Sequence, residues 1–176
     1  MTAPRRPLDD LLLYRLSRLL SVAGSMVIRL CEGRFGITRR EWRLVAVLAS
    51  RGELSSSELA EHAQLDRART SKSVGSLVSK QLVSRVVRPG DRRQVRLALT
   101  ESGQALYEEL FPLVTQINGE LMGALDENDA AQFDECLRRL HTRAERMVEE
   151  AVLPKADRGR RSAGGAASPL KPRKPE

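Results

Sequence analysis

The fold is decided by residues 66–81, which read DRARTSKSVGSLVSKQ. Asp66 has the position of an N-cap, so this stretch predicts a helix that continues to about Gln81. Helical spacing groups an apolar side that we expect to face the core: Thr70, Val74, Leu77 and Val78. The opposite side holds only cations and short hydroxyls: Arg69, Lys72, Ser73, Ser76 and Lys80. A merely solvated face normally mixes Glu with Lys, so a side without carboxylates favours contact with nucleic acid.

The distribution of charge supports this interpretation. The chain has 176 residues and a net charge of +7, and between Arg67 and Arg96 nine basic residues accompany one acidic residue, Asp91. A second basic segment runs from residue 154 to 176, and the remainder of the chain is net acidic. An acidic body with one concentrated basic segment is typical of a surface that meets phosphates, because neutralised phosphates release counterions.

Two short helices are predicted immediately before this stretch, each opened by a capping box. Thr38 with Glu41 begins the first, which ends at Gly52, and Ser55 with Glu58 begins the second, which ends near residues 64–65. Capping boxes so close together indicate short helices joined by tight turns.

After Leu82 the apolar period changes from helical to alternating. Residues 83–88 and 94–99 predict two strands, and Pro89-Gly90-Asp91 has the composition of a turn. We therefore expect a hairpin with one face on the core and with Asp91, Arg92 and Arg93 at its tip.

Long helices are predicted at both ends of the chain. The segment from Leu8 to Leu30 is apolar around more than one face, and two further helices are expected from Thr100 to about Leu125 and from Asp126 onward. The last of these has an apolar stripe: Phe133, Leu137, Leu140, Ala144 and Met147. Helices with such wide apolar surfaces need more neighbours than one chain supplies, so a partner subunit is a natural source.

Together these elements predict a mainly α protein with a small β-hairpin wing, which is the winged helix-turn-helix arrangement. The helix at 66–81 would enter the major groove, and the wing would reach the minor groove. The expected DNA contacts are Arg67, Arg69, Ser71, Lys72, Ser73, Ser76, Lys80, Arg92 and Arg93. The alternative interpretation of the same residues is an exposed cationic face without a ligand.

The sequence resembles the MarR family of bacterial regulators over nearly all of Leu8 to Val152. The resemblance is carried by residues 36–38 (GIT), 58–60 (ELA), 65–67 (LDR), 82–85 (LVSR), 91–93 (DRR) and 99–103 (LTESG). It implies a homodimer formed by the terminal helices that binds pseudo-palindromic operators, and it implies that Asp91 orients Arg93. Gln81 departs from the family, which usually has Gly here, so either the turn avoids positive φ or it tolerates a modest strain.

On this basis the expected organisation has three parts. Residues 1–35 and 101–153 form a helical dimerisation lobe, residues 36–100 form the DNA-binding region, and residues 154–176 form a disordered basic tail. The expected function is that of a sequence-specific transcriptional regulator, and specifically a repressor. The alternatives are a helical protein that binds a partner, or an architectural DNA- or RNA-binding protein without a small-molecule switch.

Members of the family commonly release DNA when a small aromatic or phenolic acid enters a cleft beside the dimerisation helices. The residues that we expect near such a cleft are Ser17, Arg18, Arg43 and His62. The alternative interpretation of each residue, without a ligand, is an ordinary exposed side chain or a surface ion pair.

Other classes of function find little support in the sequence. There is no HExxH, phosphate-binding Gly loop or GxSxG motif, so we expect neither an enzyme nor a cofactor. Cys31 and Cys136 show no metal-ligand spacing, and we interpret both as buried free thiols, with redox sensing as the alternative. No apolar run approaches the length of a membrane span and no signal peptide is recognisable, so a cytoplasmic location is expected.

Overall fold

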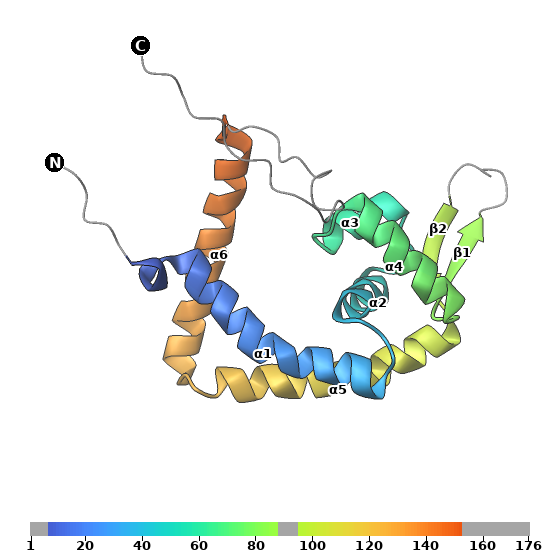
Figure 1. Ribbon diagram of the computed structural model, residues 1–176, viewed down its shortest axis with the longest axis horizontal. Coiled ribbons are helices and arrows are strands. Elements are labelled where there is room, and N and C mark those ends of the chain that lie inside the picture. The colour runs from blue at the N-terminus through green and yellow to red at the C-terminus, as the bar shows by residue number, and fades with distance from the viewer. Residues whose placement is uncertain (1–6, 88–94, 153–176) are drawn as a thin grey trace, which may run out of the picture. The chain divides into compact units, whose positions relative to one another are not determined.

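The computed structural model describes residues 7–87 and 95–152 (Figure 1). The chain divides into two units, Met1–Asp126 and Glu127–Glu176. The elements of the first unit are η1 (Leu8–Asp10), α1 (Leu12–Arg34), α2 (Arg39–Arg51), α3 (Ser56–His62), α4 (Arg67–Ser79), β1 (Val83–Val87), β2 (Val95–Leu99) and α5 (Glu101–Met122). The second unit contains α6 (Glu127–Glu150). The mainly α fold with one hairpin agrees with the sequence prediction.

The predicted helix starts are confirmed. Thr38 and Glu41 form a complete capping box at α2, and Ser55 and Glu58 form another at α3. Asp66 caps α4 by accepting the backbone N–H of Arg69 at 2.8 Å. These contacts satisfy N–H groups that have no partner inside the helix, which is why such local patterns predict boundaries well.

The first helix differs from the prediction at both ends. Leu11 is extended, with φ −75° and ψ 123°, and separates η1 from α1. At the other end α1 continues to Arg34, four residues beyond Leu30, and Gly36 with φ +62° ends it. The carbonyl oxygen of Cys31 accepts the N–H groups of both Phe35 and Ile37, so the turn into α2 is held by backbone hydrogen bonds.

The core of the first unit lies among α2, α3, α4, α5 and the hairpin. Its buried side chains include Leu44, Leu48, Leu59, Leu77 and Leu110. Val74 and Leu77 on α4 are 3% and 0% exposed, as the apolar side of this helix predicted. Trp42 extends the core toward α5 by stacking on Tyr107, with ring centroids 5.8 Å apart.

The hairpin is antiparallel and anchored at its base. Val83 pairs with Leu99 and Val87 with Val95, and the buried side chains of Val83 and Leu97 place one face on the core. Leu54, just before α3, forms an additional β-bridge with Leu97 through hydrogen bonds of 3.1 and 2.7 Å. The predicted tip at residues 91–93 lies outside the described residues.

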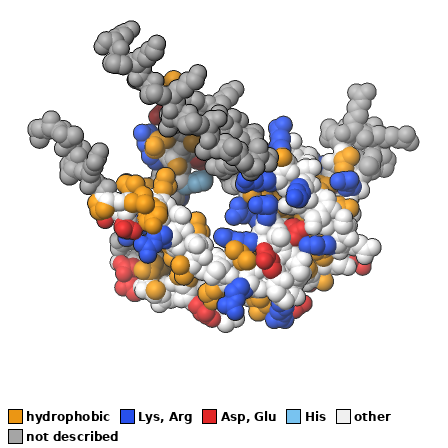
Figure 2. Space-filling view, viewed as in Figure 1, with side chains coloured by type: hydrophobic (Ala, Val, Ile, Leu, Met, Phe, Trp, Pro, Cys, Tyr) orange, Lys and Arg blue, Asp and Glu red, His pale blue; other side chains and the backbone are white. Residues whose placement is uncertain are grey.

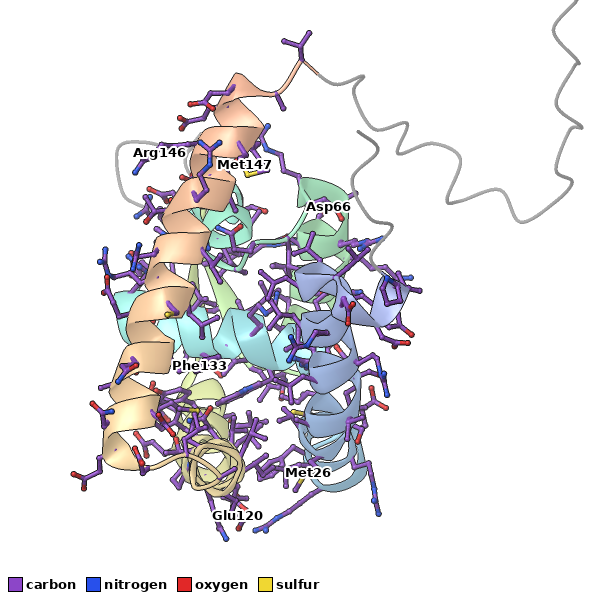
Figure 3. All side chains as sticks on the ribbon, turned by 90° about the vertical axis from the view of Figure 1, so that its left-hand side faces the viewer. Met26, Asp66, Glu120, Phe133, Arg146 and Met147 are labelled. Atoms are coloured by element: carbon purple, nitrogen blue, oxygen red, sulfur yellow. The ribbon has the colours of Figure 1, made fainter. Side chains whose placement is uncertain are left out.

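In the second unit, α6 has the predicted apolar stripe but no buried residue. Phe133 and Met147 point to the same side of the helix in Figure 3, whereas Arg146 points to another side. Cys136 on α6 is exposed, so the interpretation of both cysteines as buried is wrong for Cys136 and correct for Cys31. No helix within residues 7–87 and 95–152 is both long and apolar enough to cross a lipid bilayer.

The turn between α4 and β1 resolves the question raised by Gln81. Its backbone has φ +59°, so this turn adopts the left-handed conformation with a non-glycine residue. The conformation is held because the Thr100 hydroxyl donates to the Gln81 carbonyl oxygen at 2.6 Å, and the Thr100 N–H donates to the Leu82 carbonyl oxygen at 3.1 Å.

We expect Gln81→Gly to stabilise the protein by about 1 kcal/mol, because glycine removes the steric cost of positive φ and loses part of this gain to unfolded-state entropy. The matched control is Gln81→Ala, which shortens the same side chain but keeps a Cβ. Denaturant unfolding monitored by circular dichroism measures both free energies of unfolding. Equal stability of the two variants would contradict the strain argument.

Gly103 and Gly119 on α5 offer a matched test of close packing. A methyl group at Gly103 would overlap the carbonyl oxygen of Leu82, whereas one at Gly119 would meet nothing within 4 Å. We therefore expect Gly103→Ala to destabilise the fold by about 1–3 kcal/mol and Gly119→Ala to stabilise it by up to ~1 kcal/mol. Thermal unfolding distinguishes them, and midpoints that shift in the same direction would refute the contact.

Candidate nucleic-acid interface

The outward side of α4 forms the candidate interface. Four of the predicted contact residues are exposed on it: Arg67, Arg69, Ser71 and Lys72. A group of Lys and Arg side chains is visible over α3 and α4 in Figure 2. Three cations and a hydroxyl within two turns give a surface suited to phosphate oxygens and to base edges.

Arg69 is held in place by the residue that caps the helix. Its Nε lies 3.1 Å from Asp66 Oδ2, while the same carboxylate accepts the Arg69 backbone N–H. The side chain is still 52% exposed, so the guanidinium keeps N–H groups available to a ligand. Asp66 therefore orients this cation without burying it.

Ser73 was predicted to face DNA, and this prediction is wrong. It is 6% exposed and lies on the inward side of α4 beside Val74 and Leu77. The reason is that the buried sector of α4 is wider than the four apolar residues indicated, and a small hydroxyl residue fits at its edge.

Ser76 and Lys80 were predicted to contact bases and backbone, but the structure directs both toward α2. Lys80 Nζ donates to the Gly36 carbonyl oxygen at 2.8 Å and to Glu41 Oε2 at 3.0 Å. Ser76 is half-buried one turn before Lys80 and helps to lower the pKa of Glu41. The interpretation of Lys80 as a free cation is therefore corrected: its ammonium group is engaged within the protein.

Glu41 is a buried carboxylate, only 3% exposed. Burial raises its pKa, but hydrogen bonds from Ser76, the Thr38 backbone and Lys80, with the Lys80 charge, outweigh burial and lower the pKa below the ordinary value of 4.5. Because the folded-state pKa is depressed, the stabilisation from this group is present above pH 4.5 and is lost as the pH falls through the lowered pKa.

Arg96 was counted in the basic segment but assigned no role by the sequence. Its Nη1 lies 2.9 Å from Glu58 Oε2, and its Nη2 donates to the Glu53 carbonyl oxygen at 2.9 Å. These bonds connect β2 to the start of α3 beside the Leu54–Leu97 bridge. No local pattern indicated this pairing, because Arg96 and Glu58 lie 38 residues apart.

On β1, Arg85 is exposed and adds a cation that the sequence analysis did not single out. Arg92 and Arg93, with the orienting Asp91, lie outside the described residues, so their predicted roles stay predictions. Within residues 7–87 and 95–152, no three His, Cys, Asp or Glu side chains are grouped as metal ligands.

The four residues predicted to line an effector cleft are distributed along three helices. Ser17, Arg43 and His62 are exposed. Arg18 is also exposed; it pairs with Asp9 at 3.1 Å and borders a shallow hollow with Arg15, Leu19 and Val22. Arg43 Nη1 donates to the Ala63 carbonyl oxygen at 3.2 Å, next to His62. The structure thus places Arg43 near the end of α3, and among the described residues it records no contact of Arg18 with Arg43 or His62.

Comparison with known proteins agrees with this geometry. The MarR family profile matches residues 35–94, which include α2, α3, α4 and β1. Over this region the chain matches the MarR family. The members of this winged-helix family are transcriptional regulators and not enzymes.

Individual MarR relatives extend the match. The transcriptional repressor NicR of Pseudomonas putida is 32% identical over 104 residues, which is 59% of this chain and 66% of NicR. A MarR/EmrR regulator structure from Acinetobacter sp. ADP1 superposes with a TM-score of 0.74 at 25% identity, covering 81% of this chain and 100% of that one. BpsR from Bordetella bronchiseptica, whose DNA binding is regulated by 6-hydroxynicotinic acid, superposes with a TM-score of 0.69 at 21% identity, covering 78% and 97%.

Proposed function

We propose that this MarR-family chain binds duplex DNA sequence-specifically as a homodimer and represses transcription. The observation that carries the proposal is the outward side of α4, where Arg67, Arg69 and Lys72 are exposed and the carboxylate of Asp66 serves as the cap. An α-helix with this composition fits the major groove, where cations meet phosphates and guanine edges, and Ser71 adds a short hydrogen-bonding group. The repressor role is supported by the likeness to NicR.

The homodimer is supported by apolar surface that one chain leaves uncovered. On α1, Leu13 and Val22 are 79% and 74% exposed, and on α6 Val148 is 78% exposed. Long helices that expose large apolar side chains in this way are characteristic of subunit interfaces. A dimer would present two copies of α4 to half-sites roughly 10 bp apart on a pseudo-palindromic operator.

The direct test exchanges Arg67 and Lys72 for Ala. We expect the double variant to bind a duplex selected by the wild-type protein at least tenfold more weakly. The slope of log K against log salt concentration should fall by about two units, because two phosphate contacts are lost. Fluorescence anisotropy over a salt series measures both quantities, and analytical ultracentrifugation checks that dimerisation is unchanged.

The matched control is Arg29→Ala, which removes one exposed cation from α1. It should leave the affinity and the salt dependence near their wild-type values. If the α4 variant binds the selected duplex as well as the wild type does, the outward side of α4 is not the DNA-binding surface; if the wild type selects no duplex, the favoured alternative becomes a helical protein that binds a partner.

As the second part of the proposal, a small aromatic or phenolic acid acts as an effector that releases the protein from DNA. It is supported by exposed cations on the described helices, among them Arg18 and Arg43, which are suited to a carboxylate, and by the expectation from family resemblance. Ser17 and His62 remain the further proposed neighbours of the ligand.

We expect hydroxybenzoates or pyridinecarboxylates to weaken DNA binding by the wild-type protein, and Arg18→Ala or Arg43→Ala to reduce that response by removing a carboxylate partner. A titration of the protein–DNA complex with a panel of these acids measures the response, and benzamide serves as an uncharged control. A flat response of the wild type across the whole panel would argue against an effector of this class.

A further inference from the structure

One buried polar cluster joins three parts of the first unit: the turn before α2, the first turn of α2, and the end of α4. Glu41 is its centre. Glu41 Oε2 accepts the backbone N–H of Thr38 at 2.7 Å and the ammonium of Lys80 at 3.0 Å, while Lys80 also reaches the Gly36 carbonyl oxygen at 2.8 Å. Ser76, one turn before Lys80 on the same side of α4, also lowers the pKa of Glu41.

The cluster is costly to open. A carboxylate that is 3% exposed has lost most of its hydration, and it is tolerated only because protein groups replace the water. Two of those groups, Ser76 and Lys80, lie four residues apart and therefore on the same side of α4. Any movement of α4 away from α2 would separate Glu41 from Lys80 and leave the carboxylate with its capping hydrogen bond from Thr38, so the ion pair favours one position for the last turn of α4.

The same geometry gives Lys80 a different role from its neighbours in sequence. Its side chain is 36% exposed, but the ammonium group lies between two oxygens of the protein. Arg67, by contrast, is exposed at the start of the same helix, and its side chain forms no hydrogen bond or ion pair within residues 7–87 and 95–152. The cations of α4 therefore fall into two groups, one that faces solvent and one that binds the protein.

We propose that Glu41, Ser76 and Lys80 form a positioning cluster that sets the placement of α4 for DNA recognition, and that Lys80 supports DNA binding through Glu41 and not through a phosphate. This inference rests on the proposed function. It assigns to Glu41, a buried residue of α2, an effect on DNA affinity without any contact with DNA.

Glu41→Gln separates this role from a phosphate contact, because the two roles predict effects of opposite sign. A phosphate-binding Lys80 released from its counter-ion would tighten DNA binding and steepen the salt dependence. A positioning cluster that has lost its charge would weaken binding to the selected duplex, by about tenfold or ~1.4 kcal/mol. Fluorescence anisotropy with the full-length chain measures the difference.

Lys80→Met gives the second test, with Lys80→Arg as the conservative rescue. Loss of a phosphate contact would reduce the salt slope by about one unit for any sequence. Loss of positioning would leave the slope unchanged and would weaken binding to the selected duplex more than to a random duplex. Lys80→Arg should restore the preference, because a guanidinium can bridge the same two oxygens. Circular dichroism establishes that each variant is folded at the assay temperature.

Hydrogen exchange in the free protein provides a readout that needs no DNA. Glu41→Gln and Lys80→Met should both speed exchange of the Thr38 amide and of the last turn of α4. Arg67→Ala should weaken DNA binding without changing these rates. If the wild type binds no duplex, the proposed function fails, and exchange alone decides whether the cluster fixes α4. Tighter binding by Glu41→Gln, or unchanged exchange in both cluster variants, would overturn the inference.

Discussion

The candidate interface depends on the burial of one side of α4. Val74 and Leu77 are in the core, and with Thr70 they set the rotation of the helix about its axis. Because the helix repeats every 3.6 residues, that rotation alone determines that Arg67, Ser71 and Lys72 face outward. Removing a buried Leu typically costs about 2–5 kcal/mol, so the rotation is strongly determined.

Polar contacts then fix what the apolar core leaves adjustable. Lys80 and Glu41 attach the end of α4 to α2, and Arg96 and Glu58 attach the base of the wing to α3. The packing of Leu and Val side chains is non-directional, whereas an ion pair with short hydrogen bonds has a preferred geometry. The basic residues of this segment therefore serve two purposes: some face solvent, where DNA would lie, and others hold the reading elements in place.

This division explains how far the sequence could predict the structure. Capping boxes at Thr38 and Ser55 were correct because both partners lie within one helical turn. The inward position of Ser73 was missed because this residue lies at the border of the buried side of α4. There, packing against neighbouring elements determines whether a side chain is buried. The partner of Lys80 was missed because Glu41 is 39 residues away and no local rule links them. The break between η1 and α1 at Leu11 was also missed, because Leu11 is not a Pro, a Gly or a typical cap residue.

Protection of Lys72 from acylation tests most directly whether the outward side of α4 lies against duplex DNA. Lys72 is exposed in the free protein, while the nearby Lys80 is held by Glu41 and provides an internal comparison. Mass spectrometry of the full-length chain labelled with an N-hydroxysuccinimide ester would give the rate at each lysine. We expect saturating duplex to slow the labelling of Lys72 severalfold and to change the labelling of Lys80 little. Equal labelling of Lys72 with and without bound duplex would contradict it.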